Sequence, residues 1–272
     1  MTQTKPTGYH VRHDLRPDFT FELLTLLHAL PDGQNEEALR DVAEMQGYAL
    51  RQRSNYSKML RSLQELDLIE RTRQSISLTE KGRVIASTML YQRDLLAELI
   101  HIVYYTSYTY QPYKRFSWSY QTLCDWLWNS APCEIHRDRL VNTVSQAAVD
   151  QFGEQGISFS TQSISGILHW VGALNPPCIV EANSLFTRRS HCPVESFMVA
   201  LHDTYELQKG DTLSIPLDES VKERVCRICL ITPQSFSEML ELAERTFSCL
   251  QVWRRRGDRL VITDFSWDVL EE

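Results

Sequence analysis

The sequence of 272 residues lacks the features of a membrane or secreted protein. No apolar run reaches the roughly 18 to 20 residues that a membrane-spanning helix requires. The polar start, MTQTKPTGYHVRHDLRP, contains no apolar segment of the signal-peptide kind. The seven cysteines are an odd number scattered from Cys124 to Cys249, unlike the disulfide framework of a small secreted domain. We therefore expect a cytoplasmic protein that contacts no membrane and keeps most of its thiols reduced.

The common catalytic motifs are also missing. The sequence has no Walker loop, dinucleotide-binding fingerprint or nucleophile elbow, and the segment 153–156, GEQG, is too short and follows a helical pattern. A nuclease needs an acidic pair and a lysine on adjacent strands. The nearest set is Glu206 with Lys209 near Asp211, and its spacing is wrong. We expect a non-enzymatic protein without a cofactor.

Cys226 and Cys229 have the spacing of zinc ligands, and the neighbours His191 and Cys192 are able to complete a set of four. The pair lies inside a helical pattern, however, where a spacing of three residues places both thiols on one apolar face. Core packing is the simpler interpretation of the two cysteines. Stoichiometric zinc in the purified protein would favour a metal site instead.

Positive charge is scarce in the chain as a whole and concentrated in one segment. The net charge of −7 disfavours a protein that coats nucleic acid indiscriminately, because such binding depends on neutralising phosphates. Residues 51–83 nevertheless hold eight basic and four acidic side chains. Residues 91–272 hold 16 basic and 23 acidic side chains, which accounts for the whole deficit. The sequence therefore predicts a focused basic surface.

Residues 51–82, RQRSNYSKMLRSLQELDLIERTRQSISLTEKG, contain this basic segment and predict a helix followed by a hairpin. Ser54 is suited to cap a helix whose apolar side chains recur at three- and four-residue steps. Those side chains are Tyr56, Met59, Leu60, Leu63 and Leu66, and the opposite face carries Lys58, Arg61 and Ser62. The alternating segments 68–72 and 75–79, joined by Arg73 and Gln74, predict a β-hairpin. Thr79 is suited to cap the next helix.

Two earlier helical patterns, residues 18–30 and 35–45, end at the turn signals Pro31-Asp32-Gly33 and Gly47. The segment from about Phe19 to Thr88, above all LIERTRQSISLTEKGR, resembles the winged helix-turn-helix DNA-binding superfamily, in which MarR-like and PadR-like regulators carry a similar Leu-Thr-Glu-Lys-Gly after the wing. The resemblance covers about a quarter of the chain. It implies a groove-reading helix at about residues 54–67 and a phosphate-contacting wing at about residues 70–77.

Double-stranded DNA is the partner that this resemblance and the charge pattern predict. The side chains expected to face base edges or nearby phosphates are Asn55, Ser57, Lys58 and Arg61. The side chains expected to hold the backbone are Arg51, Arg53, Arg71, Arg73 and Lys81. Arg254, Arg255 and Arg256, at the tip of a predicted C-terminal hairpin, form a second phosphate candidate. An acidic protein surface is an equally good partner for that tip.

The helix, strand and hairpin patterns recur along the chain, and we predict a mainly helical fold with small β-hairpins, built from tandem winged-helix domains. The expected parts are an N-terminal arm at 1–17, a winged helix-turn-helix domain at 18–90, a connecting helix and aromatic linker at 91–116, a second winged-helix-like domain at 117–210 and a partial winged-helix unit at 211–272. In the arm, Arg12, His13 and Arg16 are able to reach a phosphate or a neighbouring subunit, unless the terminus is poorly ordered.

Two connecting segments leave alternatives open. The pattern from Glu80 to Tyr105 predicts one long helix, which forms a dimer interface or joins two domains of one chain. The aromatic stretch 104–120, YYTSYTYQPYKRFSWSY, offers rings that stack on unpaired bases, or that pin a linker to the domains on either side. The pinned linker is the simpler interpretation.

The sequence supports two classes of function. The first is a DNA-binding protein of the transcriptional-regulator kind, acting as a homodimer or with a partner subunit. The second is a tandem winged-helix adaptor within a larger nucleoprotein complex, resembling the kleisin-binding subunits of bacterial condensin-like complexes or serving a prokaryotic antiviral defence system, and binding mainly protein. The acidic second half and the uncharged predicted helix at 160–174 fit the adaptor.

Overall fold

The computed structural model describes residues 8–30, 32–47, 53–72, 74–180, 184–254 and 257–266, with the side chains of 53–55 excepted. Within these ranges the chain forms eleven α-helices and small antiparallel sheets of two or three strands. The predicted mainly helical class with small β-hairpins is therefore confirmed. No helix in these ranges is long and apolar enough to cross a membrane.

The first set of elements contains the basic segment. Its elements are α1 (Pro17–Ala29), α2 (Glu36–Met45), α3 (Arg53–Glu65), β1 (Ile69–Arg71) and β2 (Ile76–Leu78). Asn35 caps α2 by accepting the Ala38 N–H at 2.8 Å, as its residue type favours. The strands β1 and β2 pair antiparallel, with Glu70 opposite Ser77. Gln34, which precedes α2, forms a β-bridge to Ile76 and so extends this hairpin by one residue.

Two further sets follow with the same order of elements. The second comprises α6 (Arg115–Ser130), β3 (Cys133–Glu134), α7 (Arg137–Phe152), α8 (Thr161–Gly172), β4 (Ile179–Val180) and β5 (Leu185–Phe186). The third comprises α9 (Val194–Lys209), β6 (Ile215–Pro216), α10 (Glu219–Ile228), a 3-10 turn (Pro233–Ser235), α11 (Phe236–Thr246), β7 (Leu250–Trp253) and β8 (Arg259–Ile262). In each set the last strand pairs both with the strand before it and with the short segment between the first two helices.

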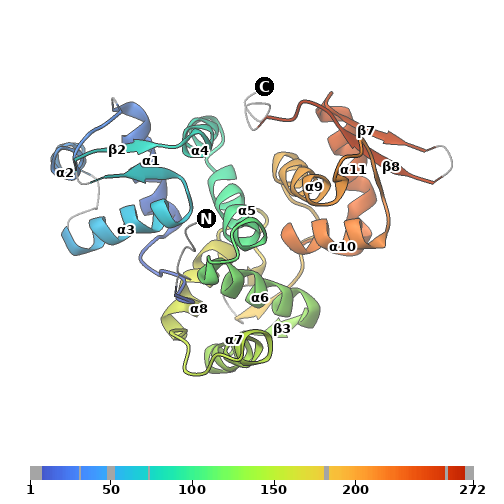
Figure 1. Ribbon diagram of the computed structural model, residues 1–272, viewed down its shortest axis with the longest axis horizontal. Coiled ribbons are helices and arrows are strands. Elements are labelled where there is room, and N and C mark those ends of the chain that lie inside the picture. Colours follow the sequence, from blue (N-terminus) through green and yellow to red (C-terminus); the bar gives the residue numbers. More distant parts are fainter. Residues whose placement is uncertain are drawn as a thin grey trace.

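Helix α5 (Leu95–Tyr110) lies at the centre of the molecule, with the three sets arranged around it (Figure 1). Residues 95–107 of α5 are all buried. The helix packs against α1, α4, α6, α8, α9 and α10. Of the two alternatives for this segment, the joining of domains within one chain is the one the packing supports.

One local prediction is wrong. The single helix expected from Glu80 to Tyr105 is two helices, α4 (Glu80–Tyr91) and α5, because Gln92 leaves the helical region with φ −135° and ψ 85°. Most rings of the aromatic stretch are buried in the core, including Tyr104, which stacks on Tyr120 with ring centroids 4.9 Å apart. Those buried rings are closed to unpaired bases.

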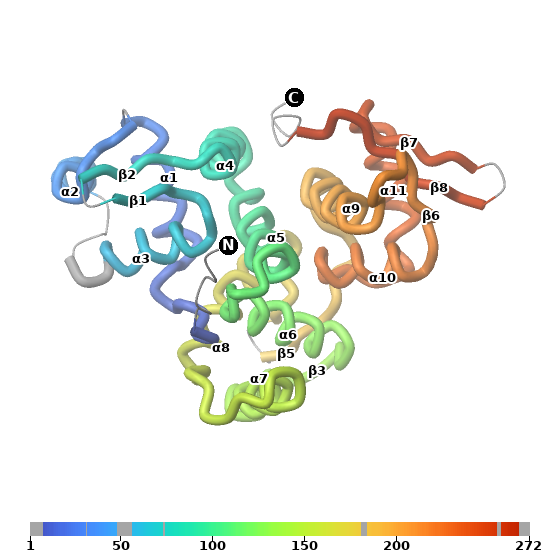
Figure 2. Tube along the Cα trace, viewed as in Figure 1, coloured from blue at the N-terminus to red at the C-terminus, as the bar shows by residue number. Residues whose placement is uncertain are grey.

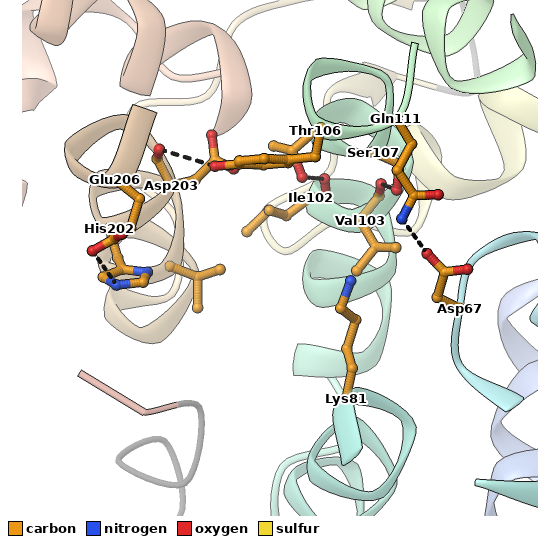
Figure 3. A pocket seen from close by; sticks show the side chains of 12 residues that line it. Asp67, Lys81, Ile102, Val103, Thr106, Ser107, Gln111, His202, Asp203 and Glu206 are labelled. Atoms are coloured by element: carbon orange, nitrogen blue, oxygen red, sulfur yellow. Dashed lines mark hydrogen bonds and ion pairs between the residues drawn. The ribbon is translucent and has the colours of Figure 1, made fainter. Parts of the chain in front are cut away.

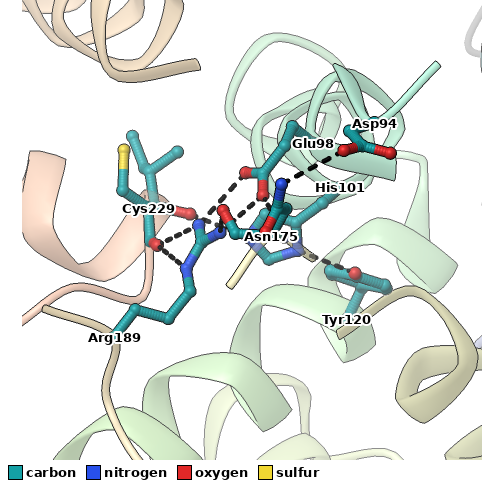
Figure 4. Close-up of polar contacts among 8 residues, drawn as sticks. Asp94, Glu98, His101, Tyr120, Asn175, Arg189 and Cys229 are labelled. Carbon is teal, nitrogen blue, oxygen red and sulfur yellow. Dashed lines mark hydrogen bonds and ion pairs between the residues drawn. The ribbon is translucent and has the colours of Figure 1, made fainter. Parts of the chain in front are cut away.

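A buried polar network joins α5 to the second and third sets (Figure 4). The Arg189 guanidinium, which follows β5, donates to both carboxylate oxygens of Glu98 on α5, at 2.5 and 3.1 Å. It also donates to the carbonyl oxygen of Cys229, at the end of α10. Burial opposes the charge on Arg189, but the Glu98 carboxylate outweighs this effect and the pKa of Arg189 is raised. Glu98 thus joins the connecting helix to the second and third sets.

Candidate nucleic-acid interface

Helix α3 presents a basic outer face over a buried apolar face, as its sequence predicts. Tyr56, Met59, Leu60, Leu63 and Leu66 are at most 2% exposed. On the other side Lys58, Arg61 and Gln64 are exposed, and the Arg61 side chain keeps 66% of its accessible surface. These three residues are called the outer face of α3 below. The placement of Ser62 on this face was wrong, because Ser62 follows Met59 by three residues and precedes Leu66 by four, and so faces the core.

Glu65 is the one carboxylate in α3, and two arginines neutralise it. Arg12 of the N-terminal arm donates twice to the Glu65 carboxylate, at 2.9 and 3.0 Å, and Arg61 Nε lies 3.3 Å from it. The hydrogen bond to Glu65 raises the pKa of Arg12. Arg12 therefore ties the predicted arm to α3. With Glu65 engaged by Arg12, the outer face of α3 keeps an excess of positive charge.

The hairpin that follows α3 is braced from inside by Arg71. Its guanidinium forms an ion pair with Glu36 of α2 at 2.5 Å and donates to Ser57 Oγ at 3.1 Å. The Arg71 side chain is only 23% exposed. Arg71 and Ser57, both predicted to contact DNA, therefore already have partners within the protein. Their observed contribution is to hold the hairpin against α2 and α3.

The Leu-Thr-Glu-Lys-Gly motif has a structural explanation in this chain. Thr79 Oγ1 accepts the Gly82 N–H at 3.0 Å, which caps α4, and donates to the carbonyl oxygen of Asp67 at 2.7 Å. A Cβ atom on Gly82 would lie 1.9 Å from the carbonyl oxygen of Leu68. The motif therefore locks the start of α4 against the turn that leaves α3. This contact explains the residue types at positions 79 and 82.

Lys81 of the same motif lies on a different surface from the outer face of α3. It lines a cavity of about 250 Å³ between α5 and α9 (Figure 3). Burial lowers the pKa of its amine. The lining contains neither Lys58 nor Arg61. Lys81 was predicted to hold the DNA backbone together with those residues, and the structure does not bring it to them.

The carboxylates of this cavity are already paired. Asp67 accepts from Lys114 at 2.6 Å and from Gln111 at 2.9 Å. Asp203 accepts from Arg224 and Tyr110, at 2.8 and 2.9 Å. The remaining carboxylate, Glu206, forms an ion pair with Lys209 at 2.6 Å. The cavity therefore gathers charges of both signs that already compensate one another.

The predicted C-terminal contacts lie at the far end of the third set. Arg254 is exposed and forms an ion pair with Glu244 at 2.5 Å, while Arg255 and Arg256 fall outside the described residues. Arg51 and Arg73 also fall outside them, as do the side chains of Arg53 and Asn55. Figure 1 places the β7–β8 hairpin and α3 on opposite sides of α5. The two predicted phosphate-contacting regions therefore do not form a single surface.

The third helices of the three sets differ in charge. Helix α3 contains three basic residues and one acidic residue, α8 contains no charged residue besides His169, and α11 contains three glutamates and one arginine. Because phosphate neutralisation needs cations, α3 is the best suited of the three to a polyanion.

The buried cysteines show no metal cluster. Cys192, Cys226 and Cys229 are at most 4% exposed, and burial raises the pKa of the Cys226 thiol to about 12. Within the described ranges, no three side chains among histidine, cysteine, aspartate and glutamate are grouped so as to hold a metal ion. The packing of Cys226 and Cys229 in the apolar interior agrees with the core interpretation.

No family model matches this sequence, and no curated protein matches it either. Two solved structures are similar to its fold: one described as SspB, with a TM-score of 0.62, and one described as magnesium ion-bound SspB, with a TM-score of 0.61. Each alignment has 16% sequence identity and covers 97% of this chain and 87% of the solved chain. At this identity the likeness establishes that almost the whole chain shares the SspB fold, and nothing further.

Proposed function

We propose that this chain is a non-enzymatic, double-stranded-DNA-binding protein of tandem winged-helix architecture that places α3 in the major groove. The observation that carries the proposal is the exposure of Lys58 and Arg61 on α3, beside a carboxylate that Arg12 already neutralises. The order of three helices and a hairpin in the first set also fits a helix-turn-helix followed by a wing.

The outer face of α3 has the chemistry that groove recognition uses. Arginine and glutamine are able to form paired hydrogen bonds with guanine and adenine, and a lysine amine contacts phosphate as a point charge. The hairpin is fixed by the pair of Arg71 and Glu36, so it meets the DNA backbone as a preformed wing. A rigid surface loses less conformational freedom on binding than a mobile one.

The first prediction concerns Lys58 and Arg61. Replacing both with alanine removes the two exposed cations, and each lost contact of this kind costs about 1 to 3 kcal/mol. We expect the affinity for a duplex to fall by about 30-fold or more, measured by fluorescence anisotropy at fixed salt. The midpoint of urea unfolding should stay unchanged, because both side chains are exposed.

A matched control tests whether the location of the charge matters. Arg245→Ala with Lys222→Ala removes the same charge from α11 and α10 of the third set. This control should bind the duplex as the natural protein does. Equal affinities for the natural protein, the control and the α3 variant would contradict the proposal.

The adaptor function is kept as a second candidate because the third set exposes apolar side chains. Leu213 is 82% exposed, Trp253 is 50% exposed and Leu242 is 46% exposed. Exposed apolar groups of this size mark protein contacts when they are contiguous. Co-purification with one protein subunit in a fixed ratio, lost on Leu242→Ser with Trp253→Ser and accompanied by weak duplex binding, would favour this candidate.

One of the similar solved structures is described as magnesium-bound. The carboxylates of the cavity between α5 and α9 are Asp67, Asp203 and Glu206, and each is engaged by a lysine or arginine. Since Mg²⁺ would have to displace these cations, this cavity does not fit a magnesium site in this arrangement. The proposed function includes no metal.

A further inference from the structure

A second basic region lies along the N-terminal arm and the second set, and it includes arm residues that the sequence already indicated as able to reach a phosphate. It consists of His10, Arg12, His13 and Arg16 of the arm, His169 of α8 and Arg137 at the start of α7. We call these six residues the basic track. Figure 2 shows the arm passing from beside α8 up to α1, between the first and second sets.

Neighbouring contacts connect the basic track to the outer face of α3. Arg61 on the outer face of α3 and Arg12 in the arm both form an ion pair with the Glu65 carboxylate, at 3.3 and 2.9 Å. Burial is the main cause of the lowered pKa of His10, and the charges of Arg12 and His13 add to it. These residues therefore lie within electrostatic range of one another.

The far end of the track surrounds His169. Burial lowers the pKa of His169, and Arg16, His13 and Arg137 each lower it further. His169 and Arg137 also line a cavity of about 270 Å³ with Ser165 and apolar side chains. The pocket thus combines the Arg137 cation, the His169 imidazole, a hydroxyl donor and the positive end of the α7 dipole, which together suit a phosphate group.

The track leaves cations and polar atoms unsatisfied. Within the described part of the chain, neither Arg16 nor Arg137 forms an ion pair, although both are exposed. Apart from Glu65, the carboxylate that forms an ion pair with the track in the described ranges is Asp14, which lies 3.7 Å from His13. The Nδ1 atoms of His13 and His169 are buried and have no hydrogen-bond partner among the described residues. The two exposed arginines are therefore open to a partner that supplies negative charge and acceptors.

The arm is fixed in place and does not need to order on binding. A Cβ atom on Gly166 of α8 would lie 2.9 Å from the carbonyl oxygen of Val11, so the arm backbone lies directly on this helix. His10 Nδ1 lies 2.5 Å from Ser163 Oγ of the same helix, and Val11 and Leu15 are fully buried. The spacing between α3 and the His169 pocket is therefore preset by the fold.

We propose that the basic track binds successive phosphates of the DNA backbone where the duplex leaves α3, with the pocket of Arg137 and His169 as its far end. This inference rests on the proposed function and extends it to a second contact surface. Duplex DNA is favoured over a free phosphate compound because the cations continue to α3 instead of ending around one pocket.

Charge reversal at the far end of the track tests the inference. We expect Arg16→Glu with Arg137→Glu to weaken binding of a duplex of about 25 base pairs by tenfold or more and to reduce the slope of log affinity against log salt by about 2, since two phosphate contacts are lost. Binding of a duplex of about 10 base pairs, one helical turn placed under α3, should change less than twofold. The control is Arg93→Glu with Arg139→Glu, which reverses two other exposed arginines outside the track.

The outcomes separate this inference from the proposed function. If the α3 variant loses both duplexes while the track variant binds the long duplex like its control, the track inference is wrong and the function stands. If no form of the protein binds either duplex, both are wrong. Inorganic phosphate serves as a further probe. The duplex contact would be overturned, and a small phosphate ligand assigned instead, by a combination of three results. Phosphate shifts the His169 resonance, the track variant loses this shift, and the track variant binds the long duplex with unchanged affinity.

Discussion

His101 shows how a single residue ties central helix α5 to its surroundings. Its ring is fully buried, and the carbonyl oxygen of Ile228 lies 2.8 Å from Nε2. Since a carbonyl only accepts, Nε2 carries the proton, and Nδ1 accepts from the Tyr120 hydroxyl at 2.8 Å. Burial lowers the pKa of His101 from 6.5 to about 3. The folded protein therefore holds His101 in its neutral form.

This residue predicts a loss of stability in acid. The unfolded chain takes up a proton at His101 below pH 6.5 and the folded chain does not until about pH 3, so stability falls as the pH falls through this window. At pH 5 the loss amounts to about 2 kcal/mol. Urea unfolding at pH 7.5 and pH 5 should show that His101→Gln, whose amide keeps both hydrogen bonds without titrating, loses about 2 kcal/mol less than the natural protein. An identical pH dependence in both would contradict this account.

The sequence predicts residues better where the signal is local. The buried face of α3 follows from its apolar spacing, and the cap at Asn35 follows from residue type. The partners of Arg71 do not follow, because Glu36 lies 35 residues away and charge alone looks the same in an ion pair as on a free surface. The basic track was recognised only in part. Arg12, His13 and Arg16 of the arm were named as able to reach a phosphate, but only the tertiary fold brings the residues of α7 and α8 to them.

At the scale of elements, the junction of α3, its hairpin and α4 positions the proposed recognition surface. Asp67 has a positive φ of 58°, its carbonyl oxygen accepts from Thr79, and the Leu68 carbonyl oxygen accepts the backbone N–H of Thr79 at 3.0 Å. The Gly82 backbone fits directly beneath Leu68. These contacts set the angle between α3 and the hairpin. The motif contacts no DNA in the proposal, but it fixes the relative orientation of the two elements proposed to contact DNA.

Gly82→Ala is therefore expected to be severe. The added methyl group would clash with the carbonyl oxygen of Leu68, which cannot move away unless the backbone shifts. Overpacking of this kind costs about 3 kcal/mol or more. We expect a matching drop in the free energy of urea unfolding. The control Gly172→Ala, in α8, places its Cβ 3.7 Å from the nearest side-chain atom and should change stability by less than about 1 kcal/mol. Equal effects of the two substitutions would mean that the close approach at Gly82 does not matter.

At the scale of the whole molecule, one topology occurs three times with three surface chemistries. The sequence pattern indicated the repetition through its turn and hairpin signals, and α9, expected at the end of the second domain, packs on α10 and α11 of the third set. The sequence pattern did not predict the central position of α5, because a helix buried along most of its length and an interface helix share one apolar composition. The third helices differ in charge, since α3 has more basic than acidic residues, α8 is uncharged apart from His169, and α11 has more acidic than basic residues. The first set is therefore the one proposed to bind a polyanion.

The proposed contact between α3 and duplex DNA is tested most directly by site-specific photo-cross-linking. A benzoylphenylalanine at Gln64, exposed on α3, is compared with one at Leu242, exposed on α11 of the third set. Both positions are uncharged, so the cations of α3 stay in place. We predict ultraviolet-dependent cross-links to a labelled duplex from position 64, reduced by salt, and none from position 242. Cross-links from position 242 alone, or from neither position at saturating duplex, would contradict the account.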